Sequence, residues 1–413
     1  MRVCVIGLGR LGLVWALVAD AAGHDVRGLD VDAGRVAAIN RRAVDTREPG
    51  VAELLADPTC GVAATCDPAE ALADAEISVV TVPTPSAADG SFGLEAVLSA
   101  VDAIGHEAPR LAARHVVVLK STVSPGATAG PVREALEAAA RVGSDLGLVH
   151  APEFHAIGTI VRDVTHPYLL ILGGEEDWAL DRAEELHASL AEEAVPVARL
   201  DPTGAELAKL ASNSFRTTKI AFANSLAALC ATYGSDAHAV CRAVGADPHI
   251  GQGHLSPGLP FGGPCFPRDN PALRAAAAAV GLETPLAAAV EEANEQRFAE
   301  IERLGLAAPP GPIGIVGIGF KPGVDEPEGS PALELARRWE EAGREVLVHD
   351  LDSSLRTLLD ACAVVLLAEP DPQRAEELRT ELEAGAHRPQ LIDPWGALSD
   401  AARLPCLSLD GAG

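Results

Sequence analysis

Short runs of apolar residues alternate with longer alanine-rich segments along the first 195 residues of the chain. Runs of this kind are typical of buried strands, and the alanine-rich segments between them are typical of helices. We expect strands at residues 3–6, 25–29, 77–82, 116–119, 146–150 and 169–172. This alternation predicts a parallel sheet with helices on both faces.

A single long helix is predicted after this region. Thr203 and Glu206 have the spacing of a capping box, and helix-compatible sequence continues to about Tyr233, where Gly234 ends it. A helix of roughly 30 residues is about 45 Å long, which exceeds what one neighbouring domain needs to cover. We expect this helix to bridge two domains and to form a homodimer interface. A spine within one subunit is the alternative.

Beyond the long helix, a loop rich in Gly and Pro covers residues 251–269, and residues 307–312 form a linker. Further strands are predicted at residues 313–316, 345–349, 363–367 and 390–392. The predicted fold class is α/β, with two Rossmann-like doubly wound parallel-sheet domains joined by a long central helix. We expect three domains, at residues 1–195, 196–305 and 306–413.

Length and charge narrow the class of protein. A chain of 413 residues is too long to fold around one hydrophobic core, so more than one domain is expected. A net charge of −27 argues against nucleic acid and anionic membrane as partners, since both bind basic patches. No apolar run approaches the roughly 20 residues that span a bilayer, and the first strand leaves no room for a signal peptide. We therefore expect a cytoplasmic protein that acts on a small molecule.

Cysteine and lysine usage adds two expectations. The eight cysteines show no C-x-x-C pair, so we expect reduced thiols and neither a disulfide framework nor a zinc site. Only four lysines stand against 28 arginines: Lys120, Lys209, Lys219 and Lys321. In such a background a retained lysine hints at a task that arginine cannot do.

A glycine-rich turn follows the first strand directly and opens a helix. Its residues are Gly7, Leu8, Gly9, Arg10, Leu11 and Gly12. The three glycines permit a tight turn, close approach of a pyrophosphate, and packing of helix on strand. Asp30 ends the second strand, where it can bind the ribose hydroxyls of NAD and repel the 2′-phosphate of NADP; Asp32 competes for this role. Together these residues predict NAD as the cofactor.

Three further strands are followed by segments that carry chemistry, at residues 82–85, 120–126 and 152–154. Ligands collect at this end of the strands in open α/β sheets. On the long helix, Lys209 and Asn213 lie four residues apart and therefore on one face. A solvated helix face is the ordinary interpretation of such a pair, and the three strand-end segments favour a functional one.

One cysteine lies in a loop bent by glycine and proline. Cys265 is followed three and four residues later by Arg268 and Asp269, a setting that suits a nucleophile. A dehydrogenase with a covalent thiol can oxidise an alcohol beyond the aldehyde to an acid. A small buried cysteine in an irregular loop is the alternative.

With these motifs the chain resembles the UDP-glucose/GDP-mannose dehydrogenase family over nearly its whole length. Further matching segments are residues 48–50, 205–213, 319–322 and 330–333. The family oxidises C6 of a nucleotide-linked hexose to a carboxylate, using two NAD molecules in succession. It has an NAD domain, a helical dimer-forming middle and a nucleotide-sugar domain, so the resemblance implies the same organisation here.

The resemblance implies a role for each matching residue. Cys265 would capture the aldehyde as a thiohemiacetal, and a second hydride transfer would leave a thioester. Lys209 and Asn213 would stabilise the oxyanion, where one donor is worth about 2.7 to 4 kcal/mol.

Three more residues are implied to act on protons. Asp269 would orient or deprotonate a water in the first oxidation, Thr122 would hold that water, and Glu153 would assist thioester hydrolysis. The implied cofactor-binding residues are Gly7, Leu8, Gly9, Arg10, Leu11, Gly12, Asp30, Pro83, Thr84, Ser121 and Thr122. The implied substrate-binding residues are Glu153, Phe154, Lys209, Asn213, His249, Phe261, Gly262, Arg268, Phe320 and Lys321.

The substrate side departs from the family pattern. Residues 155–158 are His-Ala-Ile-Gly where the family has Leu-x-Glu-Gly, and Arg268 replaces a lysine. His249 and Trp395 each replace an arginine, and Glu328 with the following glycine replaces an Arg-Glu pair near the cofactor phosphates. Loss of cations near phosphates weakens binding unless others compensate. These changes leave the nucleotide and the sugar open.

We therefore expect an NAD-dependent four-electron oxidation of a nucleotide sugar, with UDP-glucose as the default substrate and a specialised sugar nucleotide or nucleoside derivative as the alternative. A two-electron dehydrogenase of the β-hydroxyacid type also joins an NAD domain to a long helix, but lacks the Cys265 loop and the second α/β unit. A non-catalytic nucleotide-sugar binder is the third hypothesis, which the lost cations favour and the intact catalytic positions oppose.

Overall fold

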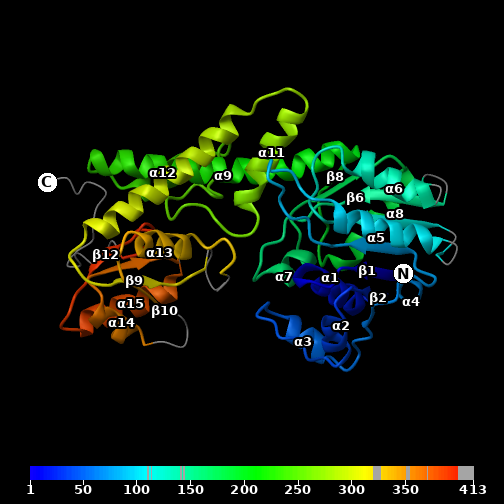
Figure 1. Ribbon diagram of the computed structural model, residues 1–413, viewed down its shortest axis with the longest axis horizontal. Coiled ribbons are helices and arrows are strands. Elements are labelled where there is room, and N and C mark those ends of the chain that lie inside the picture. Colours follow the sequence, from blue (N-terminus) through cyan, green and yellow to red (C-terminus); the bar gives the residue numbers. More distant parts are fainter. Residues whose placement is uncertain are drawn as a thin grey trace. The chain divides into compact units, whose positions relative to one another are not determined.

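The computed structural model describes residues 1–108, 111–112, 114–139, 142, 145–319, 327–349, 354–369 and 371–398. The chain divides into two units, residues 1–211 and residues 212–413. Each unit contains one β-sheet flanked by helices (Figure 1).

The first unit is built on an eight-stranded sheet. Its strands are β1 (Arg2–Ile6), β2 (Asp25–Leu29), β3 (Ala63–Thr65), β4 (Ile77–Val80), β5 (His115–Leu119), β6 (Leu146–His150), β7 (Leu170–Gly174) and β8 (Val197–Leu200). They lie in the order β3-β2-β1-β4-β5-β6-β7-β8. The six strands predicted in this region are confirmed.

β7 and its parallel neighbour β8 run opposite to the other six strands, so β7 runs against the predicted direction. All neighbouring strands of this sheet are parallel except β6 and β7, which pair antiparallel. A parallel pair needs a crossover that carries the chain back along the sheet, usually an α-helix. The connection between β6 and β7 contains only the six-residue α7 (Ile160–Thr165), so β7 enters from the opposite end.

Helices cover both faces of this sheet. On one face lie α1 (Arg10–Ala21), α2 (Ala33–Asn40), α3 (Val51–Ala56), α7 and α8 (Asp177–Leu190). On the other lie α4 (Pro68–Ala71), α5 (Glu95–His106), the π-helical turn η2 (Thr128–Val132) and α6 (Arg133–Ala139). Because both faces of the sheet are buried, its inner strands are continuous apolar runs in the sequence. A ligand can reach the sheet only at the ends of its strands.

Two strands of the sheet, β3 and β8, were not predicted from the sequence. β3 is three residues long and rich in alanine, which has low strand propensity. β8 forms the edge of the sheet, and its Val197 and Leu200 are more than a third exposed. Neither strand has the buried apolar run that marks the others.

The long helix is confirmed as α9 (Pro202–Thr232), with 31 residues. It begins in the first unit and ends in the second. Gly234 follows it with a φ of 67°, a left-handed conformation that favours glycine.

The predicted capping box at the start of α9 is wrong. Asp201 caps the helix instead, since its Oδ1 accepts a hydrogen bond from the Gly204 N–H at 2.8 Å. Glu206 is 1% exposed and accepts hydrogen bonds from the N–H groups of Gly126 and Thr128, at 2.5 and 2.7 Å. Its carboxylate thus ties the loop after β5 to α9.

The helical part of the second unit follows, with α10 (Ala237–Gly245), α11 (Phe266–Ala279) and α12 (Pro285–Ala307). The Gly- and Pro-rich loop is shorter than predicted, because α11 begins directly after Cys265. Arg268 and Asp269 therefore lie in the first turn of a helix. Pro267 near the helix start is the sequence signal for this boundary.

The second sheet has four parallel strands in the order β10-β9-β11-β12. These are β9 (Ile313–Val316), β10 (Val346–His349), β11 (Val364–Leu367) and β12 (Gln390–Ile392), and all four were predicted. Helices α12 and α13 (Pro331–Glu341) share one apolar cluster with it. Helices α14 (Leu355–Ala361) and α15 (Pro372–Ala384) share another.

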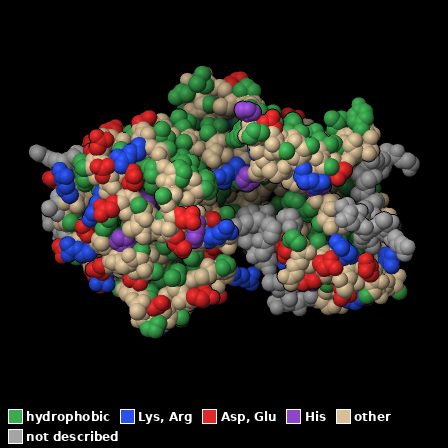
Figure 2. All heavy atoms as spheres, turned by 180° about the vertical axis from the view of Figure 1, so that it is seen from behind, with side chains coloured by type: hydrophobic (Ala, Val, Ile, Leu, Met, Phe, Trp, Pro, Cys, Tyr) green, Lys and Arg blue, Asp and Glu red, His purple; other side chains and the backbone are tan. Residues whose placement is uncertain are grey.

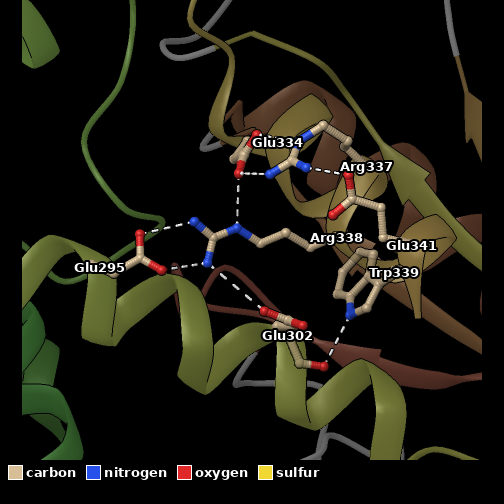
Figure 3. A network of polar contacts seen from close by, with 7 residues as sticks. All are labelled: Glu295, Glu302, Glu334, Arg337, Arg338, Trp339 and Glu341. Atoms are coloured by element: carbon tan, nitrogen blue, oxygen red, sulfur yellow. Dashed lines mark hydrogen bonds and ion pairs between the residues drawn. The ribbon is translucent and has the colours of Figure 1, made fainter.

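A charged network joins α13 to α12 (Figure 3). Arg338 forms a two-pronged contact with Glu295, at 2.6 and 2.8 Å, and donates to Glu334 Oε1 at 2.8 Å. The neighbouring Trp339 is fully buried and donates from Nε1 to the carbonyl of Glu302 at 2.9 Å. These contacts fix α13 along α12, next to the second sheet.

Acidic side chains are distributed over the face shown in Figure 2 and are interspersed with Arg and Lys side chains. This agrees with the net charge of −27. Among the described residues, no helix has the length and apolar character needed to cross a membrane.

Candidate active site

The glycine turn between β1 and α1 has the shape of a dinucleotide cradle. Gly7 has a φ of 87°, and a Cβ there would lie 2.9 Å from the carbonyl oxygen of Thr81. A Cβ on Gly12 would lie 1.8 Å from the carbonyl oxygen of Gly7. Helix α1 can therefore pack this close to the turn only because residue 12 is glycine. A Cβ on Gly9 would have no described atom within 4 Å, which leaves space before the N terminus of α1.

The position of this turn in the sheet also suits a ligand. β1 and β4 are neighbours at the point where the strand order reverses, which is the usual place for a cofactor in open α/β sheets. Leu8 is buried, Leu11 is half-buried and Arg10 is exposed at the start of α1.

Asp30 lies directly after β2 and is 5% exposed. Its carboxylate accepts hydrogen bonds from the N–H groups of Leu8 and Asp32, at 2.7 and 2.9 Å, and from Arg35 at 2.9 Å. Burial raises the pKa of Asp30, but these donors outweigh burial and lower it overall. Asp32 instead caps α2 through Gly34, which favours Asp30 as the ribose ligand.

The segments after β4 and β5 lie at the same end of the sheet. Thr84 is buried and Pro83 is exposed. Ser121 donates from Oγ to the carbonyl of Val82 at 2.7 Å, which joins the two segments, and Thr122 is half-buried beside it.

Lys209 and the Glu153 segment meet within the first unit. The Lys209 ammonium lies 5.1 Å from the centre of the Phe154 ring and is 6% exposed. Phe154 also packs edge-on against Tyr168, with ring centres 6.0 Å apart. The predicted substrate-binding residues Glu153, Phe154 and Lys209 are therefore close together.

A cluster of buried polar side chains surrounds Glu153, which was not expected from the sequence. The Lys120 ammonium forms an ion pair with Glu153 and contacts His187 Nε2 at 2.9 Å. The second Glu153 oxygen lies 2.6 Å from His155 Nδ1. Burial lowers the pKa of His155 to about 3, so this ring is neutral at pH 7. Lys120 and His155 were visible in the sequence, but the contribution of α8 was not.

A cavity of about 450 Å³ opens beside this cluster. Trp15, Lys120, Glu153, His155, Tyr168 and His187 are among its lining residues. All of them belong to the first unit, and the volume lies within the range of small-ligand pockets.

In the second unit, Cys265 is exposed at the N terminus of α11. The positive end of the helix dipole lies at this terminus. In the first turn, the buried Asp269 accepts a hydrogen bond from Asn213 Nδ2 at 2.5 Å. The neighbouring Asn270 donates to Thr217 Oγ1 at 3.0 Å, so two contacts join α11 to α9.

The predicted substrate residues of this unit have different settings. Phe261 is buried, and its N–H donates to Asn294 Oδ1 at 2.7 Å. A Cβ on Gly262 would lie 2.5 Å from the carbonyl oxygen of Gly329, so these two segments touch through glycine. Arg268 is half-buried and His249 is exposed. Phe320 and Lys321 lie outside the described residues.

The structure also describes two residues that differ from the family pattern, Trp395 and Glu328. Trp395 packs against Gly258, where a Cβ would lie 2.0 Å from its ring. Glu328 is exposed. Trp395 is thus part of the apolar packing of the second unit and supplies no charge.

The glycine turn at the switch point and the buried acid after β2 define an NAD-dependent dehydrogenase of the Rossmann class. Two family models match the sequence: the NAD-binding domain of the UDP-glucose/GDP-mannose dehydrogenase family over residues 1–191, and its central domain over residues 203–296. The chain belongs to the UDP-glucose/GDP-mannose dehydrogenase family, which comprises NAD-dependent nucleotide-sugar 6-dehydrogenases.

Individual relatives agree with this assignment. UDP-glucose 6-dehydrogenase AglM of Haloferax volcanii is 36% identical over 85% of this chain and 83% of its own length. GDP-mannose 6-dehydrogenase of Pseudomonas putida is 31% identical over 85% of this chain and 81% of its own. The structure of a UDP-glucose dehydrogenase from Pyrobaculum islandicum is 31% identical, covers 95% of this chain and 94% of its own, and superposes with a TM-score of 0.86.

Proposed function

We propose that this protein oxidises the C6 alcohol of a nucleotide sugar to a carboxylate, transferring four electrons to two NAD molecules. The observation that carries the proposal is Cys265, an exposed thiol at the N terminus of α11 in a chain whose first domain binds NAD. A two-electron dehydrogenase has no use for a nucleophile there. UDP-glucose is the default substrate, as in the Haloferax and Pyrobaculum relatives.

NAD would be held by the cradle of the first unit. Gly7, Gly9 and Gly12 leave room for its diphosphate at the N terminus of α1, and Asp30 would bind the adenosine ribose. Thr84 and the segment at Ser121 line the same strand ends. The bound nicotinamide accepts hydride.

The protein groups would act in two stages. In the first, Thr122 would hold a water that passes the alcohol proton to the carboxylate of Asp269, while hydride passes from C6 to NAD and an aldehyde forms. The aldehyde carbon then bonds to the sulfur of Cys265, and Lys209 and Asn213 stabilise the oxyanion of the thiohemiacetal.

In the second stage, hydride leaves the thiohemiacetal and a thioester forms. Water then attacks the thioester carbon with Glu153 as base, and the thiolate of Cys265 leaves. The charge-assisted contact between Asn213 and Asp269 supports this assignment, since it holds an amide of α9 against the carboxylate in the first turn of α11, the helix that follows Cys265.

The identity of the nucleotide and sugar is the open part of the proposal. His249 is exposed, Trp395 is absorbed into apolar packing, and Glu328 adds a negative charge where the family pattern has a cation. A specialised sugar nucleotide or nucleoside derivative is therefore the alternative substrate for the same chemistry.

The test is a panel of UDP-, GDP- and dTDP-sugars with NAD. We expect two NADH per sugar from the right substrate, and we expect Cys265→Ser to stall after the first oxidation because serine forms no thioester. Stoichiometry is measured from NADH absorbance at limiting sugar. One NADH per sugar would instead support a two-electron dehydrogenase, and no turnover on any sugar would favour a non-catalytic binder.

We also propose a homodimer formed through α9, a cytoplasmic location, and three domains at residues 1–195, 196–305 and 306–413. The dimer proposal rests on apolar side chains of α9 that are exposed in the single chain. Phe215, Phe222 and Leu229 are 64%, 54% and 54% exposed and lie at seven-residue spacing. That spacing places them on one helix face.

A further inference from the structure

The Lys120 ammonium is buried among polar atoms and an aromatic ring. It is 2% exposed, forms an ion pair with a carboxylate oxygen of Glu153, and makes hydrogen bonds to His187 Nε2 at 2.9 Å and to the carbonyl of Ala151 at 3.2 Å. The centre of the Trp15 ring lies 4.1 Å from Nζ. Two N–H groups thus meet hydrogen-bond acceptors, and the positive charge is paired with a carboxylate and lies near an aromatic ring.

The protonation of His187 supports this arrangement. Its Nδ1 lies 2.7 Å from the carbonyl of Ala183, which only accepts, so Nδ1 carries the proton. Burial lowers the pKa of His187 well below its ordinary value, so the ring is neutral and Nε2 is an acceptor. Burial also lowers the pKa of Lys120, while the acceptors around Nζ favour its charged form.

The site is specific for lysine. An arginine would bring five donors in a planar fork to a pocket with three acceptors placed around one nitrogen. The chain nevertheless uses arginine for 28 of its 32 Lys and Arg residues. The arrangement of acceptors around Nζ therefore explains why this position is lysine rather than arginine.

Glu153 lies at the centre of the cluster. One carboxylate oxygen faces Lys120 and the other faces His155, while the next residue, Phe154, contacts the Lys209 ammonium. Glu153 also lines the cavity, whose volume has room for water. Glu153 thus contacts Lys120 and His155 and borders a space that a water can enter.

We propose that Lys120 is a positioning residue for thioester hydrolysis, which holds Glu153 ionised and oriented so that it can accept a proton from the attacking water. The proposal rests on the proposed function above and deepens it. Lys120 acts only through Glu153.

The step it supports is balanced as follows. The water oxygen bonds to the thioester carbon, one water proton goes to Glu153, and the C–S bond breaks with its electron pair on the sulfur of Cys265. The product leaves as a carboxylic acid that then ionises. A protonated Glu153 could not take the first proton, so the ammonium beside it sets the pH range of the step.

The other charged or titratable groups around Glu153 come from several elements. These are His150 on β6, His155 in the same loop, Asp163 on α7, His187 on α8 and Lys209 on α9. Burial lowers the pKa of His150 and His155 to about 3, so both are neutral at pH 7. Lys120 is a cation in direct contact with the carboxylate.

The experiment compares Lys120→Met with the wild-type chain on the substrate found in the panel. We expect Lys120→Met to form the first two NADH per site normally, and then to turn over about tenfold or more slowly. The thioester should accumulate and appear as a sugar-acyl mass increase on the acid-quenched protein, located at Cys265. We expect Lys120→Arg to fail to restore the rate.

The pH profile separates positioning from a merely structural role. Without the ammonium, the acid limb of the hydrolysis rate should move to higher pH, because an adjacent cation favours the ionised carboxylate. His115→Asn is the matched control. His115 is 1% exposed and hydrogen-bonded at the opposite end of β5, so its loss perturbs the same strand without touching Glu153.

A double variant guards against misfolding as the explanation. In a Glu153→Gln background, Lys120→Met should leave the slow hydrolysis rate unchanged, because Lys120 acts through the carboxylate. The proposal is overturned if Lys120→Met turns over like His115→Asn without an adduct, or slows the Glu153→Gln variant by its full factor. If the wild type itself makes one NADH per sugar, the proposed function fails, and this proposal fails with it.

Discussion

Asp30 has a neighbour that makes cofactor preference testable at one residue. Arg35 is 42% exposed, and its guanidinium is held by the Asp30 carboxylate. In Asp30→Ala we expect the free guanidinium to face the ribose 2′ position, where it can accept the phosphate of NADP. The NAD-over-NADP ratio of kcat/KM should fall by about tenfold or more, at roughly 1.4 kcal/mol per tenfold.

The control for this variant is Asp32→Asn, which keeps a good N-cap on α2 and leaves Asp30 in place. Both variants are assayed with each cofactor at a fixed sugar concentration. If Asp32→Asn lowers the ratio more than Asp30→Ala does, the ribose ligand was assigned to the wrong carboxylate.

Single residues were predictable where a motif fixes their backbone. The glycine turn and Asp30 follow from sequence, because Gly7 and Gly12 lie where a Cβ would clash with neighbouring backbone. The surroundings of Lys120 did not follow, since Trp15 and His187 come from α1 and α8 and reach Lys120 only in the folded sheet. The retained lysine was the one sequence signal of that cluster.

Among the elements, strands and helices with strong apolar runs were predicted to within a few residues. The direction of β7 was not predicted. Strand direction depends on how the connecting segment packs, and the sequence of the strand itself does not encode it. The boundary of α11 was missed for a related reason. Its first turn carries proline and charged residues, which also suit a loop, and only the fold places Cys265 at a helix N terminus.

The charged network on α13 should weaken in acid. Hydrogen bonds from Arg337 and Arg338 outweigh burial and lower the pKa of Glu334 to about 2. A lowered folded-state pKa means that the stabilisation is complete above the unfolded value of about 4.3 and is lost as pH falls toward 2. Because Glu334 is partly exposed, we expect no more than about 1 kcal/mol from it.

Glu334→Gln tests this by thermal unfolding at pH 7 and pH 3. The variant should melt lower than the wild type at pH 7, and the difference should shrink at pH 3, where the wild-type carboxylate starts to lose its charge. Glu340→Gln, on the same helix and exposed, is the control and should show little change at either pH. A difference that stays constant with pH would contradict the assignment to this network.

Net charge and exposed apolar surface have opposite effects on the association of two copies of this chain. Each chain carries a net charge of −27, so two copies repel, and this repulsion is screened by salt. A dimer therefore needs an apolar contact large enough to overcome that repulsion. The exposed stripe of Phe215, Phe222 and Leu229 is the feature of α9 that can supply one.

Phe222→Glu places a charge at the middle of this stripe and should convert the dimer to a monomer. Burying an unpaired carboxylate at an apolar contact costs several kcal/mol, which exceeds the gain from one phenyl ring. Mass is measured by light scattering after size exclusion, at low and at moderate salt. Higher salt should favour association of the wild type if charge repulsion opposes the contact.

Val280→Glu is the matched control, because Val280 is 72% exposed and follows α11, away from the α9 stripe. It should leave the mass of the particle unchanged. A monomeric wild type, or dissociation by Val280→Glu but not by Phe222→Glu, would place the interface elsewhere. If Phe222→Glu is monomeric yet oxidises the sugar at the wild-type rate, then each chain carries a complete site, and the dimer serves stability rather than catalysis.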